Sequence, residues 1–154
     1  MTARHDEMPD VQRDGYVIST DPARLDRPLI HGFLSRDSYW AQDIPYDVVM
    51  HALDHSLCFG LYAPAGQIGL ARVVTDYATV AYLADVFVLP EHRGRGLSKW
   101  LMETVVAHPA LQGFRRFLLN TRDAHGLYQQ TGFTPLAKPE WAMERFDPDV
   151  YRRR

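Results

Sequence analysis

The feature that most constrains this chain is a glycine-rich turn between an apolar strand and an amphipathic helix. Residues 86–90 read V-F-V-L-P, residues 93–98 read R-G-R-G-L-S, and apolar side chains then recur at helical spacing up to Val105. Such a turn points several unpaired backbone N–H groups, together with the positive end of the helix dipole, at one spot. The stretch therefore predicts an anion-binding turn, and a plain strand-to-helix connection is the alternative interpretation.

The composition of the turn suits a diphosphate but matches neither of two common phosphate loops. Gly94 and Gly96 let the backbone approach an anion without a Cβ in the way, and Arg93, Arg95 and Lys99 add positive charge. A Walker A loop needs G-x-x-x-x-G-K-[ST], and the sequence has no such string. A Rossmann loop needs a small residue where Lys99 stands and an acidic residue about 20 positions further on. Neither nucleotide-binding class fits.

The surrounding elements predict one α/β domain. With 154 residues, 46% hydrophobic and 23% charged, the composition is that of a single globular core. Residues 1–14 lack periodicity and are expected to form a flexible leader, so the domain would comprise residues 15–154. Strands are expected at residues 16–18, 57–62, 67–74, 78–88, 117–121, 133–136 and 141–145. Helices are expected at residues 21–34, 45–56, 97–108 and 123–131.

Charge and cysteine content restrict the partners. Seventeen basic and 19 acidic residues give a formal net charge of -2, so the chain lacks the positive field that nucleic acid requires. The single Cys58 and the polar N-terminus favour a reducing cytoplasm. No stretch approaches the roughly 18 apolar residues needed to span a bilayer, so no membrane partner is expected.

Two spaced motifs resemble the GNAT superfamily of N-acetyltransferases. That family has [Q/R]-x-x-G-x-[G/A] after a strand ending in V-x-P, which corresponds here to residues 93–98 after residues 88–90. It also has N-x-x-A-x-x-[LF]-Y-x-x-x-G-F, and residues 121–133 read T-R-D-A-H-G-L-Y-Q-Q-T-G-F. Ser98 departs from the first pattern, and Thr121, preceded by Asn120, departs from the second. The resemblance covers roughly residues 15 to 146.

The resemblance implies a fold and a cosubstrate. The fold would be α/β, with a mixed, mostly antiparallel sheet that splays between its central strands and has helices on both faces. Acetyl-CoA would be the acetyl donor, with its pantetheine arm in the splay, and no metal is expected. The residues expected to bind it are Val86, Phe87, Val88, Arg93, Gly94, Arg95, Gly96, Leu97, Ser98, Asn120 and Tyr128.

Acetyl transfer to an amine requires a group that takes a proton from the amine, which is protonated at pH 7. It also requires a group that protonates or hydrogen-bonds the leaving thiolate. The resemblance places Tyr128 where the family commonly has the hydroxyl that hydrogen-bonds or protonates the thiolate; a core anchor is the alternative. A tyrosine pKa of about 10 exceeds a thiol pKa of about 8.5, which favours hydrogen bonding over full transfer. Asp85, the single charge between Val80 and Leu89, is the expected base, or else it pairs with an arginine. His125, Glu91 and water stay open.

Other candidates carry less weight. His51 and His55 resemble half of a zinc-protease motif, but no third ligand follows, and solvated histidines are the preferred interpretation. Cys58 lies in an apolar run and is expected to be a small buried hydrophobe. Three aromatic residues between the first two helices are expected either in the core or in an acceptor pocket: Tyr39, Trp40 and Tyr46.

The sequence thus predicts an N-acetyltransferase that joins acetyl-CoA and a small-molecule or peptide amine in a ternary complex. A non-catalytic CoA-binding sensor of the same fold is the competing hypothesis. The acceptor groove is built from variable loops, so the motifs leave the acceptor open. A homodimer through an edge strand or the terminal segment is also possible.

Overall fold

The computed structural model describes residues 7–153 and contains one six-stranded sheet with the order β1-β2-β3-β4-β5-β6. Its strands are β1 (Val11–Arg13), β2 (Tyr16–Ser19), β3 (Leu57–Ala63), β4 (Gly66–Thr75), β5 (Val80–Val88) and β6 (Arg116–Leu119). Neighbours are antiparallel except β5 and β6, which run parallel. The expected mixed, mostly antiparallel α/β sheet is confirmed.

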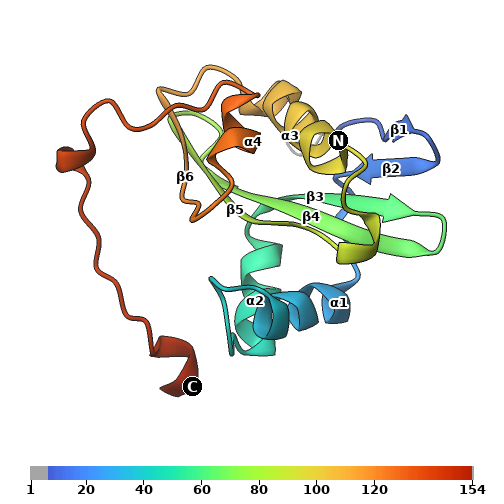
Figure 1. Ribbon diagram of the computed structural model, residues 1–154, viewed down its shortest axis with the longest axis horizontal. Coiled ribbons are helices and arrows are strands. Elements are labelled where there is room, and N and C mark those ends of the chain that lie inside the picture. The colour runs from blue at the N-terminus through green and yellow to red at the C-terminus, as the bar shows by residue number, and fades with distance from the viewer. Residues whose placement is uncertain (1–6, 154) are drawn as a thin grey trace, which may run out of the picture.

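Helices cover both faces of the sheet (Figure 1). The α-helices are α1 (Arg27–Gly32), α2 (Tyr46–Asp54), α3 (Leu97–Ala107) and α4 (His125–Gln129). Single turns occur at η1 (Pro22–Arg24), η2 (Phe33–Asp37), η3 (Pro90–His92), η4 (Pro109–Leu111), η5 (Pro139–Trp141) and η6 (Val150–Arg153). The first two α-helices lie on one face and the last two on the other, so the apolar sheet is buried on both sides.

Each face of the sheet has its own hydrophobic cluster. On the α3 side, Leu101, Met102 and Val105 are fully buried against strand residues such as Phe59. On the α1–α2 side, Ile30 and Leu34 pack with residues that include Phe87 of β5. These two clusters fix β5 from above and below, and β5 in turn carries the glycine-rich turn at its end.

β5 and β6 pair over only part of their length. The parallel register starts at Val80 opposite Arg116 and ends at Leu83 opposite Leu119, whereas β5 continues to Val88. On its other side β5 stays paired with β4 as far as Val88. The strands therefore separate beyond Leu83, which is the expected splay.

The first expected helix is divided. Asp21 caps the single turn η1 by accepting from the N–H of Ala23, and Asp26 caps α1 by accepting from the N–H of Leu29. Pro28 lies in the first turn of α1, where its missing N–H costs nothing. The proline therefore starts a helix instead of interrupting one.

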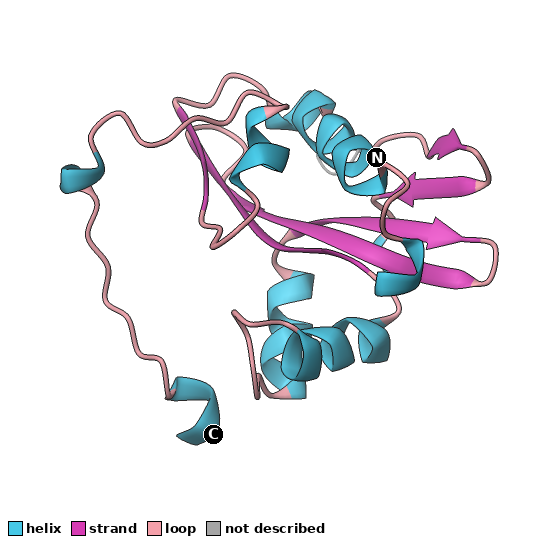
Figure 2. Cartoon of the chain, viewed as in Figure 1, coloured by secondary structure: helices cyan, strands magenta, loops and turns pink. Residues whose placement is uncertain are grey.

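Two sequence expectations about the ends of the chain are wrong. Residues 11–13 of the expected leader form β1, because the turn at Asp14 and Gly15, both with positive φ, returns the chain to pair with β2; residues 1–6 lie outside the described part. The expected closing strands at residues 133–136 and 141–145 are absent from the described sheet. Figure 2 shows this region as loop with short helical turns. The prolines at positions 135 and 139 cannot donate to a ladder, and no neighbouring strand reaches the second segment.

Candidate active site

The glycine-rich turn leaves a row of backbone amides open. Gly94 and Gly96 have φ of 80° and 73°, and a Cβ at either position would meet no atom of the protein within 4 Å. Gly96 is also the N-cap of α3. Within residues 7–153, no hydrogen bond uses the N–H groups of residues 94–98. The turn therefore combines free donors, open space and a helix N-terminus, as an anion requires.

The arginines of the turn anchor it to the sheet. Arg93 donates from Nε to the backbone oxygen of Val88 at 2.9 Å. Arg95 donates to the hydroxyl of Tyr16 in β2 at 3.0 Å, and that hydroxyl lies 3.3 Å from Nδ1 of His92. These contacts fix the shape of the turn while both guanidinium groups stay beside it.

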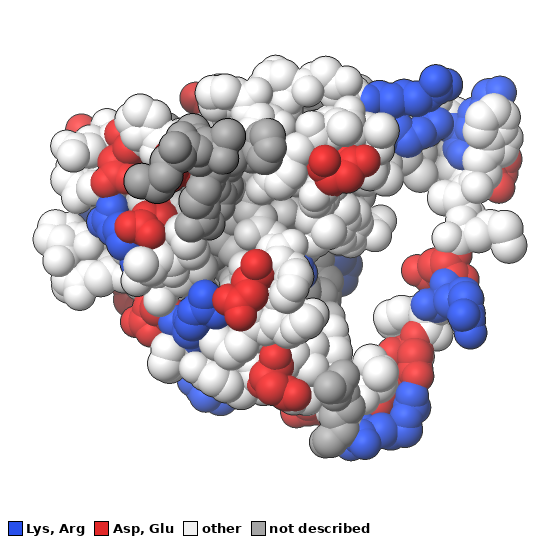
Figure 3. Space-filling view, turned by 180° about the vertical axis from the view of Figure 1, so that it is seen from behind, with Lys and Arg blue, Asp and Glu red and all other residues white. Residues whose placement is uncertain are grey.

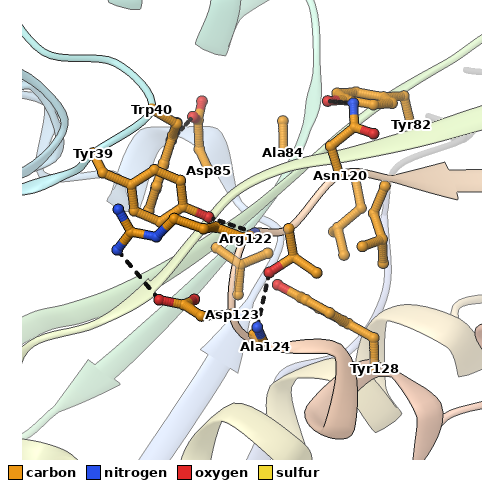
Figure 4. A pocket seen from close by; sticks show the side chains of 14 residues that line it. Tyr39, Trp40, Tyr82, Ala84, Asp85, Asn120, Arg122, Asp123, Ala124 and Tyr128 are labelled. Atoms are coloured by element: carbon orange, nitrogen blue, oxygen red, sulfur yellow. Dashed lines mark hydrogen bonds and ion pairs between the residues drawn. The ribbon is translucent and has the colours of Figure 1, made fainter.

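A pocket of about 360 Å³ opens where β5 and β6 separate (Figure 4). Its walls come from the middle of β5, from the end of β6, from the loop before α4 and from the loop after η2. The lining residues are Tyr39, Trp40, Tyr82, Leu83, Ala84, Asp85, Val86, Leu119, Asn120, Thr121, Arg122, Asp123, Ala124 and Tyr128. Two residues expected at the site, Asp85 and Tyr128, are thus brought to one cavity.

Tyr128 extends from α4 toward this pocket (Figure 4). Its side chain is mostly buried, and its ring packs edge-on against Phe133. Burial, reinforced by nearby Tyr39 and Asp123, raises the pKa of Tyr128 to about 12. No described residue hydrogen-bonds its hydroxyl group. At neutral pH this hydroxyl is therefore a protonated donor without a protein acceptor.

Asp85 is held by two donors. Its carboxylate accepts from Nε of Arg72 at 2.7 Å and from the indole N–H of Trp40 at 2.8 Å. Arg72 also donates to the hydroxyl of Ser56 at 3.0 Å. Asp85 has a φ of 55° and lies where the β4–β5 register shifts, so the backbone turns its side chain out of the regular pleat. The structure shows Asp85 paired with an arginine, which was the alternative to a role as base. The role of Asp85 as base stays a prediction.

The polar residues after β6 are used locally. Asn120 donates from its side-chain amide to the hydroxyl of Tyr82 at 3.1 Å. Thr121 accepts from the N–H of Ala124 at 3.1 Å, so it caps the approach to α4. Both border the pocket, and the expected contact of Asn120 with a cosubstrate stays a prediction.

The outer wall includes residues that the motifs did not single out. The backbone N–H of Arg122 donates to the Tyr39 hydroxyl at 3.0 Å, and its guanidinium lies 3.8 Å from the centre of the Tyr39 ring. Arg122 also pairs with Asp123 at 3.3 Å. Tyr39 and Trp40 line the pocket, as the hypothesis of an aromatic acceptor pocket expects. Tyr46 packs against His31 instead. The available sequence signal for Arg122 and Asp123 was their place at variable positions within the second motif.

Known proteins identify the family. Residues 27–133 match the Acetyltransferase (GNAT) family, and this span includes the open turn, the splay and Tyr128. The chain belongs to the GNAT family of acetyltransferases.

Related proteins agree with this membership. A Gibberella zeae protein assigned as an acetyltransferase is 38% identical, over 75% of this chain and 77% of that protein. The crystal structure of a protein of Xanthomonas campestris pv. campestris assigned to the GNAT family is 59% identical, with a TM-score of 0.86 over 88% of this chain and 96% of that one. The ribosomal-protein-S18-alanine N-acetyltransferase of Escherichia coli shares the fold, with a TM-score of 0.63 and 19% identity over 79% of each chain.

GNAT membership implies acetyl-CoA as the donor, and the site fits that molecule. The open amides of residues 94–98 suit its diphosphate, and β5 connects this turn to the splay, where Val86 and Tyr128 line one pocket. Val86, Phe87 and Val88 form the end of β5, and their contact with acetyl-CoA stays a prediction. Phe87 itself stacks on Phe33 with ring centres 4.0 Å apart, so its side chain supports β5 from the core and only its backbone is available to a ligand.

The remaining candidates do not join the GNAT site. Burial raises the pKa of the Cys58 thiol to about 12, which makes it a poor nucleophile. His51 and His55 stack on each other, and the described residues include no group of three or more side chains able to hold a metal. His125 lines a neighbouring groove beyond Tyr128. In residues 7–153 no helix is long and apolar enough to cross a membrane.

Proposed function

We propose that this GNAT protein transfers the acetyl group of acetyl-CoA to a primary amine by direct attack within a ternary complex. The observation that carries the proposal is the arrangement along β5, which runs from the pocket lined by Val86 and Tyr128 to the open amides of residues 94–98 just beyond its end. Acetyl-CoA supplies the acetyl thioester. The amine nitrogen bonds to the acetyl carbon, the carbon–sulfur bond breaks and CoA leaves as the thiolate. The amine proton passes to a base, for which Asp85, His125, Glu91 and water are the candidates.

The turn and β5 position the donor. The amides of residues 94–98 bind the diphosphate, and the α3 dipole favours its negative charge. A backbone N–H of residues 86–88 would face the carbonyl oxygen of the thioester. One such donor contributes about 2.7 to 4 kcal/mol when negative charge develops on that oxygen.

Tyr128 serves the leaving sulfur as a hydrogen-bond donor. Its pKa of about 12 lies well above the value of about 8.5 for an ordinary thiol, so complete proton transfer would be uphill by about 5 kcal/mol. A hydrogen bond needs no such transfer and still stabilises the developing thiolate. The buried hydroxyl is therefore suited to this role over the whole neutral range.

The acceptor side of the pocket is aromatic, and its carboxylates already have cationic partners. Tyr39 and Trp40 line it, with the Arg122 guanidinium over the Tyr39 ring. Asp85 pairs with Arg72 and Asp123 pairs with Arg122. The proposed acceptor is therefore a primary amine of a small molecule or of a peptide, and the charge of the lining does not select between them.

The proposal is tested by measuring CoA thiol release with a panel of primary amines. Because Cys58 is buried, a thiol reagent added to the native protein should report the product with little background. An acetyltransferase gives release that depends on both acetyl-CoA and amine. A CoA-binding sensor would bind acetyl-CoA and give no amine-dependent release with any member of the panel.

A further inference from the structure

The outer wall of the pocket carries one cationic side chain, Arg122. Among the described residues that line the pocket, it is the one lysine or arginine. Arg72 lies nearby but is not part of the lining, and its pair with Asp85 at 2.7 Å is largely shielded from water. Because the charges of that pair offset each other, Arg122 is the cation that a molecule entering the pocket meets.

The wider surface does not select for charge. On the face of the molecule in Figure 3, the lysine and arginine side chains of the described residues are interspersed with aspartate and glutamate side chains. The formal net charge of the chain is -2. A broad field that draws anions needs an excess of positive charge on one surface. Selection of an anion would therefore depend on a local contact inside the pocket.

Tyr39 holds Arg122 in place in two ways. The backbone N–H of Arg122 donates to the Tyr39 hydroxyl at 3.0 Å, and the guanidinium carbon lies 3.8 Å from the centre of the Tyr39 ring. A guanidinium over an aromatic face leaves the N–H groups around its edge for oxygen acceptors. The side chain is thereby positioned before a ligand arrives, which lowers the entropy cost of binding one.

Asp123 is a weak partner for this guanidinium. Its carboxylate accepts from one nitrogen, Nη2, at 3.3 Å, and both side chains are more than 60% exposed. An exposed ion pair with a single contact contributes little to stability. Within residues 7–153, Nε and Nη1 of Arg122 donate to no protein group. A carboxylate or a phosphate that accepts from two of these nitrogens would make a stronger, bidentate contact and can replace Asp123.

Arg122 and Tyr128 lie at different parts of the same pocket. Figure 4 shows the guanidinium group of Arg122 beside Tyr39, on the side away from Tyr128. In the proposed function the amine reacts beside the Tyr128 hydroxyl. The remainder of an acceptor that reaches this point lies along Tyr39, and its far end lies near Arg122.

We propose that Arg122 selects acceptors that carry an anionic oxygen group, a carboxylate or a phosphate, at a distance from the amine that reacts. This inference rests on the proposed acetyl transfer and names the chemical class of its acceptor. The guanidinium donates from two nitrogens to two oxygens of the anion, and the Asp123 carboxylate is released to water. Arg122 acts in binding alone and makes no contact with the reacting atoms. Small amino acids and short peptides can both supply a carboxylate of this kind.

The test compares kcat/KM for three matched acceptors: a straight-chain ω-amino acid, its ω-amino amide and the aminoalkyl phosphate of the same length, over a series of lengths. At the best length, wild type should prefer the carboxylate or the phosphate to the neutral amide by at least about tenfold. The anion with the larger preference identifies the group. In Arg122→Gln the ratio of anionic to neutral acceptor should fall toward one, mainly through a higher KM for the anionic acceptor. Because this ratio compares two acceptors on the same protein, changes in folding or in acetyl-CoA binding cancel.

Two further variants separate recognition from a structural role. Asp123→Asn should lower the KM for the anionic acceptor, by about two- to threefold, because the competing carboxylate is gone. A purely structural pair between Arg122 and Asp123 predicts no such gain. Arg115→Gln is the matched control, since Arg115 is exposed and lies outside the pocket, and it should leave the ratio unchanged.

A wild-type ratio near one, or the same ratio in wild type and Arg122→Gln, would overturn this proposal while amine-dependent acetyl transfer still stands. Absence of CoA release with every amine, neutral or anionic, would instead contradict the proposed function and this inference with it. The two failures are therefore distinguishable in one panel of acceptors.

Discussion

The carboxylate of Asp85 lies 2.7 Å from Nε of Arg72, and both side chains are largely shielded from water, with exposed fractions of 11% and 16%. The same carboxylate holds the indole of Trp40 at the pocket wall. An ion pair thus links β4, β5 and the loop that carries the aromatic wall. This ion pair affects both the stability of the fold and the availability of Asp85 as a general base.

Replacing Asp85 with Asn should lower the free energy of unfolding by about 2 to 3 kcal/mol, because Arg72 would remain shielded without its counter-charge. Asp123→Asn is the control, since its pair with Arg122 is more than 60% exposed on both sides and should contribute less than about 0.5 kcal/mol. Urea unfolding followed by circular dichroism measures both. Equal effects of the two substitutions would refute the anchoring role.

The pH profile of kcat/KM for Asp85→Asn decides between anchor and base. If Asp85 is mainly an anchor, the variant keeps the acid limb of the profile at a reduced rate. If Asp85 takes the proton of the amine, as the sequence hypothesis has it, the acid limb disappears. The measurement needs a variant that is shown to be folded at each pH.

Tyr128→Phe should lower kcat about 100-fold while the affinity for acetyl-CoA changes little, because the lost hydroxyl acts on the leaving sulfur. Folding should be unaffected, since no described residue hydrogen-bonds that hydroxyl. Tyr82→Phe removes a hydroxyl from the same pocket and is the matched control, with most of the rate retained. Steady-state kinetics and calorimetry give the two readouts. An unchanged kcat in Tyr128→Phe would assign this residue to the core alone.

Tyr62 is one of the buried groups expected to lower the stability of the fold at alkaline pH. Its hydroxyl is buried above Gly60 without a hydrogen-bond partner among the described residues, and burial raises its pKa to about 12. The pKa of Tyr62 is higher in the folded state than its value of about 10 in the unfolded state. The contribution of the protonated hydroxyl to the free energy of unfolding is therefore complete below pH 10 and is lost as the pH rises toward 12. Tyr62→Phe should therefore unfold less readily in that window.

At pH 7 the same substitution should be neutral or stabilising by up to about 1 kcal/mol, because it removes an unpaired buried polar group. Thermal unfolding at pH 7 and at pH 11 checks both effects. A clear loss of stability in Tyr62→Phe at pH 7 would mean that the hydroxyl has a partner, such as bound water.

Cys58→Ala should leave acetyl transfer intact, because direct attack by the amine needs no acyl-enzyme. In the wild type, the buried thiol with its pKa near 12 should react with iodoacetamide only after unfolding. Mass spectrometry of the native and unfolded protein measures the labelling. Rapid labelling of the native protein together with loss of activity would reopen a covalent route.

The main sheet was predictable because its signals are local. Alternation over residues 57–62 and 67–74, with turn residues between them, is enough to specify a hairpin, and the helical spacing from Leu97 specifies α3. The glycine turn was predictable for the same reason: positive φ at residues 94 and 96 favours glycine. These features depend on neighbours in the sequence.

The features that the sequence did not predict depend on contacts between residues that are far apart in the sequence. Residues 141–145 have strand character, but a strand also needs a free edge beside it, and nothing in the local pattern says which edge that is. The partners of Asp85 were equally hidden, since Arg72 and Trp40 are 13 and 45 positions away. Short polar segments such as residues 11–13 join a sheet only because a tight turn brings them back.

The most direct test of the central claim, that the turn at residues 94–98 binds the diphosphate of acetyl-CoA, is calorimetric titration of acetyl-CoA into two alanine variants. Gly94 and Gly113 have φ of 80° and 81°, and at both a Cβ would meet no protein atom within 4 Å. Gly94→Ala and Gly113→Ala should therefore lose similar folding stability, about 1 to 2 kcal/mol. We expect Gly94→Ala alone to weaken acetyl-CoA binding, by at least about tenfold, because its methyl group occupies the space of the anion. Equal affinities in the two variants would contradict the account.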